Sequence, residues 1–383
     1  MARKTNKLKT FFTSFVCLVL GLAVGAFSQI YFSLPDSYVI PEKVASHSVI
    51  TSNNHLNKQT ITDSDLSIHF LELGNKYTGD CTLIKVGDTE MLIDAGSKAS
   101  SVPYIKDYID DYVEGALDYV VVTHAHEDHY AGFSTNKFED SLFNFFDVSN
   151  IIEFSQTYKT TEKMYTNYIS NRTQEGSTVF KAHELVGQTK LLGEASANVT
   201  FEILDQKFYY ETNKADAESE NNFSVCLQIT QGDKKYLFTG DLEKEGEESL
   251  LELNGDKLSH VALYKAGHHG SGTSSSPELI QKITPDVVCV CCCAGSSQYT
   301  SKPENQFPTQ AFINNVYGNS PNTKVYVTTL CLDYKQAKFE SFNGTIVVCS
   351  NGSQNINLYF SNNDTELRNS DWFKNNRTLP ATA

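Results

Sequence analysis

The chain has 383 residues, of which 40% are hydrophobic, so it is long enough to bury the core of one large domain or two modest ones. Its net charge of −15, from 46 acidic and 31 basic residues, argues against a general nucleic-acid-coating protein, because such binding needs many Lys and Arg side chains to neutralise phosphates. Any anionic substrate must therefore be met locally, by metal ions.

The N-terminus is predicted to be a membrane-targeting segment. Residues 1–10 are basic, and the uncharged stretch 11–34 matches the roughly 20 apolar residues that a helix needs to span a bilayer. The basic flank should stay in the cytoplasm, so this transmembrane signal anchor would place the rest of the chain outside the cell membrane. Cleavage after Ala26 would instead give a secreted form.

Composition divides the remainder of the chain. Residues 35–64 are polar, lack a hydrophobic period and are predicted to be a linker. A folded body should span residues 65–362, and a polar tail should follow over 363–383. Within the body, residues 134–171 are rich in Phe and Tyr without a regular period, and they are predicted to form a lid or insertion.

Strand and helix patterns alternate through the body. Helical spacing predicts helices over 102–113 and 244–253. The predicted strands are 66–73, 81–86, 91–94, 117–123, 199–204, 224–230, 236–239, 261–265, 287–292, 324–329 and a hairpin over 345–360. This alternation favours sheets covered by helices, an α/β layered fold.

Nine cysteines would suggest disulfides in an exported protein, but their distribution favours another interpretation. Cys289, Cys291, Cys292 and Cys293 lie in one apolar run. Adjacent residues of a strand point to opposite faces, so these four thiols cannot all reach one metal ion. We therefore expect them to be small buried hydrophobic residues.

The strongest chemical signal follows the strand predicted at 117–123. His124, His126, Asp128 and His129 lie within six residues, and such groups are costly to desolvate unless a cation pairs with them. His124 and His126 can point the same way from an extended segment, while Asp128 and His129 turn toward a second ion. The spacing therefore predicts ligands for two metal sites.

Two other predicted strands end in similar residues. Asp241 follows a strand that ends in Thr239-Gly240, which would leave its carboxylate at the strand tip, free to bridge two metal ions. His268 and His269 follow the strand at 261–265. Since these strands should end at one edge of a sheet, their side chains are expected to gather in one place.

These motifs together resemble the metallo-β-lactamase superfamily. The His-x-His-x-Asp-His run, Asp94, Asp241 and the His268–Ser271 segment look most like the hydrolase domain of the competence DNA-uptake protein ComEC and its free-standing relatives. The resemblance covers residues 66–360 and implies an αββα four-layer sandwich, here preceded by the transmembrane helix, with the site at one edge. It also implies two divalent metal ions, zinc in the first place and manganese as the alternative.

The resemblance implies a role for each matching residue. His124 and His126 would hold the first ion, Asp128 and His129 the second, and Asp241 would bridge them. His269, in preference to His268, would complete the second site. Asp94 and Asp80 would stand behind the ligands and orient them. Lys265 and Asn222 would contact a substrate phosphate, or they are ordinary surface and turn residues.

The chain also departs from the family pattern. Many members supply a further histidine to the first metal, and the candidate here, His183, lacks a strand-end setting and is expected to be structural. Phe307 stands where ComEC-type domains often have a histidine before Pro308, which leaves substrate contacts at that edge open. His69 is expected in the core or on a sheet face.

The predicted activity is hydrolysis of a phosphodiester, in DNA, a nucleotide or a phosphocholine-like group, outside the cytoplasmic membrane. Two metal ions can activate a hydroxide and clamp both the attacking and the leaving oxygens, with Asp128 or Asp241 as proton acceptor. Hydrolysis of a lactam, lactone or thioester is an alternative within the superfamily. A non-catalytic metal-binding subunit of a membrane-associated uptake complex is the alternative outside it, although the sequence identifies no protein partner.

Overall fold

The structure is a computed structural model that describes residues 47–211, 219–353 and 355–381. The predicted anchor at 11–34, its basic flank and the cleavage position after Ala26 lie outside these residues. Within the described part of the chain, no helix has both the length and the apolar character needed to cross a membrane.

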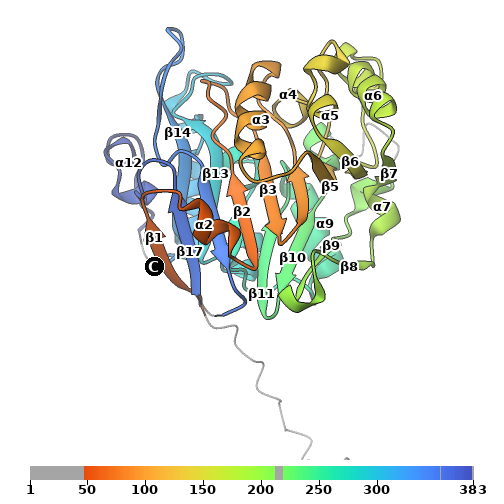
Figure 1. Cartoon of the computed structure of the whole chain (residues 1–383). Helices are drawn as coiled ribbons and strands as arrows, with labels where there is room; N and C mark the ends of the chain where they lie inside the picture. The colour runs from red at the N-terminus through yellow and green to blue at the C-terminus, as the bar shows by residue number, and fades with distance from the viewer. Residues whose placement is uncertain (1–46, 212–218, 354, 382–383) are drawn as a thin grey trace, which may run out of the picture. The chain divides into compact units, whose positions relative to one another are not determined.

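Two β-sheets dominate the described body (Figure 1). The first sheet has the order β1-β17-β16-β2-β3-β4-β5-β6-β7. Its strands are β1 (Val49–Asn53), β2 (Leu66–Phe70), β3 (Thr82–Val86), β4 (Thr89–Ile93), β5 (Ala116–Val122), β6 (Asp147–Glu153), β7 (Thr178–Lys181), β16 (Ile346–Ser350) and β17 (Asn355–Phe360).

The second sheet has the order β15-β14-β13-β12-β11-β10-β9-β8. Its strands are β8 (Thr189–Leu191), β9 (Val199–Ile203), β10 (Leu227–Gln231), β11 (Lys234–Phe238), β12 (Leu263–Lys265), β13 (Val287–Ala294), β14 (Lys324–Asp333) and β15 (Lys338–Ser341). The central strands β11 to β14 run parallel to one another.

Helices cover the outer faces of the two sheets. Apolar side chains of α3 (Val102–Asp110), α5 (Leu142–Phe145) and α6 (Lys163–Glu175) join the core around the first sheet. Those of α9 (Lys244–Asn254), α10 (Pro277–Ile283) and α11 (Gln310–Asn319) pack with the second sheet in a separate cluster. The mixed α/β fold predicted from the alternating patterns is therefore confirmed.

Strand β13 shows how the two cores are divided. Cys289 and Cys291 pack in the core shared by the two sheets, whereas Val290 and Cys292 pack on the helix-covered side. All four residues, and Cys293, are buried, and the cysteines of the described residues are free thiols. The prediction that these cysteines are buried is confirmed.

The predicted lid or insertion at 134–171 differs from the structure. This segment contributes β6, which pairs in parallel with β5 and is a regular member of the first sheet. Only its last three residues form an unbroken buried run, because Ser149 is exposed and Asn150 half-buried. Because these two polar residues interrupt the apolar run, the hydrophobic pattern did not predict a strand here.

The predicted linker and tail also contain ordered elements. Strand β1 pairs in parallel with β17, and α2 (Lys58–Thr62) buries Ile61. In the segment predicted as a polar tail, Leu367 and Phe373 join the core of the second sheet. Each of these segments has few apolar side chains. Because polar residues dominate their composition, the sequence predicted a linker and a tail instead of ordered elements.

Candidate metal centre

The predicted site residues come from strand ends that lie at one edge of the sandwich. β4 and β5 are parallel, as are β11 and β12, so residues that follow these strands emerge at corresponding ends. His129 lies in α4 (Glu127–Tyr130), just after β5, and His269 lies in η6 (Gly267–Gly270), just after β12. Asp241 follows β11.

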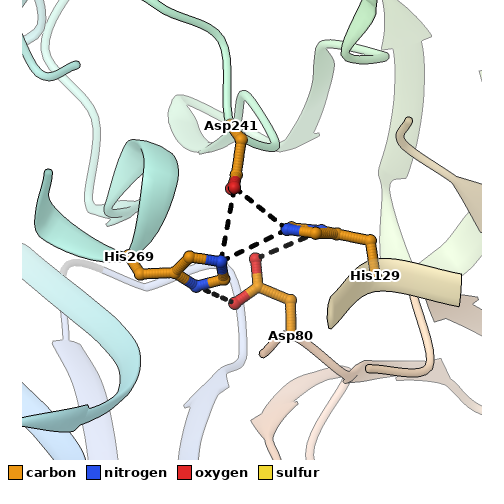
Figure 2. A group of neighbouring side chains, drawn as sticks. All are labelled: Asp80, His129, Asp241 and His269. Carbon is orange, nitrogen blue, oxygen red and sulfur yellow. Dashed lines mark hydrogen bonds and ion pairs between the residues drawn. The ribbon is translucent and has the colours of Figure 1, made fainter. Parts of the chain in front are cut away.

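Four buried side chains converge at this edge: Asp80, His129, Asp241 and His269 (Figure 2). One ligand atom of each lies within 4.8 Å of those of the other three. Asp241 Oδ2 lies 3.1 Å from His129 Nε2 and 3.3 Å from His269 Nε2. The two Nε2 atoms are themselves 3.3 Å apart.

In both histidines of this group, the ring proton is on Nδ1, which donates a hydrogen bond away from Asp241. His129 Nδ1 donates to Asp94 Oδ2 at 2.7 Å, and His269 Nδ1 donates to the carbonyl oxygen of Cys291 at 3.0 Å. Both Nε2 atoms therefore face the carboxylate of Asp241. Histidines that bind metals show this pattern, with the second ring nitrogen donating to a carboxylate or carbonyl.

The carboxylates of the group also fit a bound cation. Asp241 Oδ1 is buried and accepts no hydrogen bond within the described residues. Such an oxygen costs about 1–3 kcal/mol, and more when charged, unless something pairs with it. Burial alone would lower the pKa of His129, but the carboxylates of Asp241 and Asp94 raise it to about 10. The group thus attracts positive charge, whether carried by protons or by a metal ion.

His124 and His126 lie next to this group. His124 Nε2 is 3.0 Å from His126 Nδ1 and 4.0 Å from Asp241 Oδ2. Burial, together with the neighbouring His129 and His126, holds the pKa of His124 well below its ordinary value. A neutral imidazole is the form that binds metals. Asp241 therefore lies between the two sets of histidines, as a bridging carboxylate would.

The structure places the two adjacent histidines of η6 differently. His269 is fully buried and faces Asp241, and its Nε2 also lies 3.4 Å from Asp128 Oδ2. His268 is partly exposed, with its Nε2 3.9 Å from Asp241 Oδ2 and its Nδ1 beside Glu243. His269 is therefore the better ligand for the buried group, and His268 faces the adjoining cavity.

Asp94 supports the ligands from behind. Besides His129, it accepts hydrogen bonds from the backbone nitrogen of Thr123 and from its hydroxyl, each at 2.8 Å. These contacts connect the end of β4 to the segment that carries the histidine motif. The orientation of His129 thus depends on a buried residue that is not part of the cavity lining.

Asp80 lies closer to the centre than a supporting role requires. It precedes β3, which is antiparallel to β4, so the beginning of β3 lies at the same edge as the end of β4. Its Oδ1 is 3.2 Å from His269 Nδ1. The family resemblance predicted that Asp80 only orients the ligands, whereas the structure groups its carboxylate with His129, Asp241 and His269.

Lys265 and Asn222 were predicted to contact a phosphate. Both are buried, and their side chains contact other groups of the protein. Lys265 forms an ion pair with Asp80, and its Nζ lies 3.9 Å from Asp241 Oδ1. Asn222 Oδ1 accepts a hydrogen bond from the backbone nitrogen of Glu243 at 3.1 Å. In this structure Lys265 balances the charge of the acidic group, and Asn222 holds the loop after Asp241.

The remaining histidines lie outside the group. His183 is exposed on α7 (Ala182–Leu185), where its Nδ1 contacts Ser155 Oγ at 3.0 Å. His69 is buried in the first sheet between Ser67 and Tyr108, as expected of a core residue. Burial, and to a smaller extent the charge of Lys85, lowers the pKa of His69 to about 3.

A cavity of about 430 Å³ opens beside the metal ligands. Its lining combines ligand candidates with basic, amide and aromatic side chains: His126, Asp128, Asp241, His268, Lys98, Lys159, Asn221, Gln298, Tyr130 and Tyr299. The Tyr299 hydroxyl donates to Asp128 Oδ2 at 2.7 Å, and its ring lies 5.5 Å from that of Phe307. Sequence motifs gave no signal for Tyr299, which reaches the site from a loop more than 150 residues after Asp128.

Comparisons with known proteins place the chain in a family and show several relatives. Residues 71–264, a little over half of the chain, match the family model of the anti-Pycsar protein Apyc1. ComE operon protein 3 of Bacillus subtilis is 36% identical over 93 residues, which cover 24% of this chain and 12% of that protein. The competence protein ComA of Neisseria gonorrhoeae is 36% identical over 97 residues, covering 25% of this chain and 13% of that protein.

The matched regions thus span only about an eighth of these two relatives, at 12% and 13% of their lengths. Among solved structures, the metallo-β-lactamase fold protein YhfI of Bacillus subtilis covers 69% of this chain and 96% of its own, at 12% identity and a TM-score of 0.40. The resemblance to ComEC-type domains is confirmed. The chain belongs to the anti-Pycsar protein Apyc1 family.

Proposed function

We propose that this chain is a metal-dependent phosphodiesterase. The observation that carries the proposal is the cavity in which Asp241, Asp128 and His126 lie beside two lysines, Lys98 and Lys159. A pair of divalent ions held there would polarise a phosphoryl oxygen and lower the pKa of a water molecule. The side chains of His124, His126, Asp128, His129, Asp241 and His269, with Asp80, would hold the ions.

The protein's own residues then orient the substrate and handle the proton. Lys98 and Lys159 each lie near a glutamate, Glu127 and Glu162 respectively, so neither lysine carries an isolated charge. A phosphate entering the cavity would compete with these carboxylates for the two lysines. Asp128, held by the Tyr299 hydroxyl, faces the cavity and is placed to accept a proton.

The cavity favours a substrate of nucleotide size. At about 430 Å³ it lies within the range of about 300–1,000 Å³ that is common for small-molecule sites. The ring of Tyr299, which is 55% exposed, offers apolar surface to a base. The net charge of −15 disfavours long DNA, which binds through many basic contacts. We therefore place a nucleotide or short oligonucleotide ahead of duplex DNA.

The location of the reaction is a separate part of the proposal. The basic residues 1–10 and apolar residues 11–34 support a single-pass anchor with the hydrolase outside the cytoplasmic membrane. Protease accessibility of the body in intact cells tests this part by itself. Protection of the body from added protease until the cells are lysed would overturn it.

The activity is tested with bis(p-nitrophenyl) phosphate in the presence of zinc or manganese, against a chromogenic cephalosporin as the lactam substrate. We expect diester hydrolysis that is lost in Asp241→Asn and kept in Asp371→Asn, a matched change of an exposed carboxylate. Lactam hydrolysis without diester hydrolysis would overturn the substrate class. A chain with bound metal and no activity on either substrate would favour the non-catalytic binding subunit.

A further inference from the structure

A second group of metal-ligating side chains lies at the opposite ends of the strands. His47 stands just before β1, His260 shortly before β12, and Asp286 directly before β13. The catalytic candidates on this sheet instead follow their strands, as His269 follows β12. The three ligand atoms of the second group lie within 4.8 Å of one another.

The carboxylate of Asp286 holds this group together. Its Oδ1 lies 2.7 Å from His47 Nδ1, and its Oδ2 lies 3.1 Å from His260 Nε2. The backbone nitrogen of Ser48 donates to Oδ2 at 2.8 Å. The two imidazole rings meet edge to face, with centroids 4.8 Å apart. Residues more than 200 positions apart are thus joined at a single carboxylate.

The hydrogen bond of the other ring nitrogen of His260 determines which of its two nitrogens carries the proton. His260 Nδ1 lies 2.7 Å from the carbonyl oxygen of Thr284, which only accepts hydrogen bonds, so Nδ1 carries a proton. In a neutral ring, Nε2 would then direct its lone pair at the carboxylate of Asp286. The contact is favourable only if a second proton or a metal ion lies between them. A histidine that donates to a backbone carbonyl in this way is arranged as a metal ligand.

We propose that His47, His260 and Asp286 form a zinc site that fastens the start of β1 to the second sheet. Two imidazoles and one carboxylate are a ligand set that zinc accepts, with bonds of about 2.0–2.2 Å. The fourth position is open to water, because the His47 side chain is 70% exposed. The site is independent of the catalytic group, and it holds whether or not the chain is a phosphodiesterase.

Strand β1 needs such an attachment. It is an edge strand of five residues, paired on one side with β17, and none of its residues is fully buried. Besides the β17 ladder, the partly buried Ile50 packs against the core and the Ser48 backbone nitrogen donates to Asp286. A metal ion bound by His47 would join this strand, which belongs to the first sheet, to the residues that begin β12 and β13 in the second.

Hydrogen exchange of the β1 amides, measured by mass spectrometry on the full chain, tests the site. At free zinc ten times the dissociation constant, we expect the β1 amides to exchange about tenfold more slowly. The effect should vanish in His47→Ala, whose side chain is 70% exposed, and in His260→Gln. It should persist in His55→Ala, an exposed histidine beyond β1.

The same measurement separates this site from the catalytic one. Asp241→Asn should keep the zinc-dependent protection of β1, even if it abolishes metal binding and activity at the other edge. Native mass spectrometry should show one zinc ion fewer in His47→Ala than in the wild type. Zinc-independent exchange of β1 in the wild type, or equal protection in His47→Ala, would overturn the proposal.

Discussion

The substitution Asp94→Asn removes one charge from behind the metal ligands and leaves the fold in place. Asp94 has a positive φ of 59°, a backbone conformation in which asparagine is tolerated better than most residues. The amide keeps the size of the carboxylate and can still accept from Thr123. It cannot offer His129 a charged acceptor, so the contact at 2.7 Å between the two side chains is weakened.

The expected loss is one of metal affinity. Removing a residue that orients a metal-bound histidine typically costs 10–100-fold in affinity, or about 1.4–2.8 kcal/mol. The amide keeps the hydrogen bond from the Thr123 backbone nitrogen but puts an NH2 group where Oδ2 accepts from both the Thr123 hydroxyl and His129, so we expect a value toward the upper end. The zinc dissociation constant should therefore rise by about 30–100-fold.

Competition with a chromophoric chelator measures this constant directly. Asp118→Asn is the matched control, because Asp118 lies on the same strand as the residues before His124 and accepts one hydrogen bond, from the backbone nitrogen of Glu90. We expect wild-type affinity in the control. Wild-type zinc affinity in Asp94→Asn, with the thermal stability unchanged, would refute the role of Asp94 in orienting His129.

Three further predictions concern the loop, the ligand pair and the core. In Gly96→Ala the new Cβ would lie 1.7 Å from the carbonyl oxygen of Asp128, so calorimetry should show a loss of at least about 1–3 kcal/mol; a stable variant with full metal content would contradict this. His269→Ala should lose bound metal by elemental analysis, whereas His268→Ala should keep more of it; the reverse order would show that His268 is the ligand. Because the pKa of His69 is lowered to about 3, the unfolded chain binds a proton below the ordinary pKa of 6.5 that the folded chain does not. The free energy of unfolding should fall from pH 6.5 toward pH 3 by up to about 1.4 kcal/mol per pH unit. In His69→Gln, the free energy of unfolding obtained from urea denaturation should fall less steeply with pH. An unchanged slope would show that His69 does not stay neutral in the fold.

The residues that could be predicted from the sequence are those whose setting is local. His124, His126 and His129 follow an apolar strand within a few positions, and an isolated strand end with so many polar groups has few explanations other than a metal site. Asp241 and His269 could be added because parallel strands bring their ends to one edge. The histidine motif therefore carried most of the information about the site.

The residues that could not be predicted depend on distant pairing. Asp80, predicted only to orient the ligands, enters the group through the antiparallel pairing of β3 and β4. Tyr299 reaches Asp128 from a separate loop and has no pattern of its own in the sequence. The group around Asp286 could likewise not be predicted from the sequence. His47 lies in a stretch with the composition of a linker, and it contacts Asp286 only in the folded chain.

Anomalous diffraction at the zinc edge, on crystals of the zinc-loaded protein, tests the central claim most directly. The claim predicts an anomalous peak within about 2.2 Å of Asp241 and of His129 Nε2 and His269 Nε2, with a second peak beside His124 and His126. The absence of a peak between Asp241, His129 and His269 in zinc-loaded crystals would contradict it.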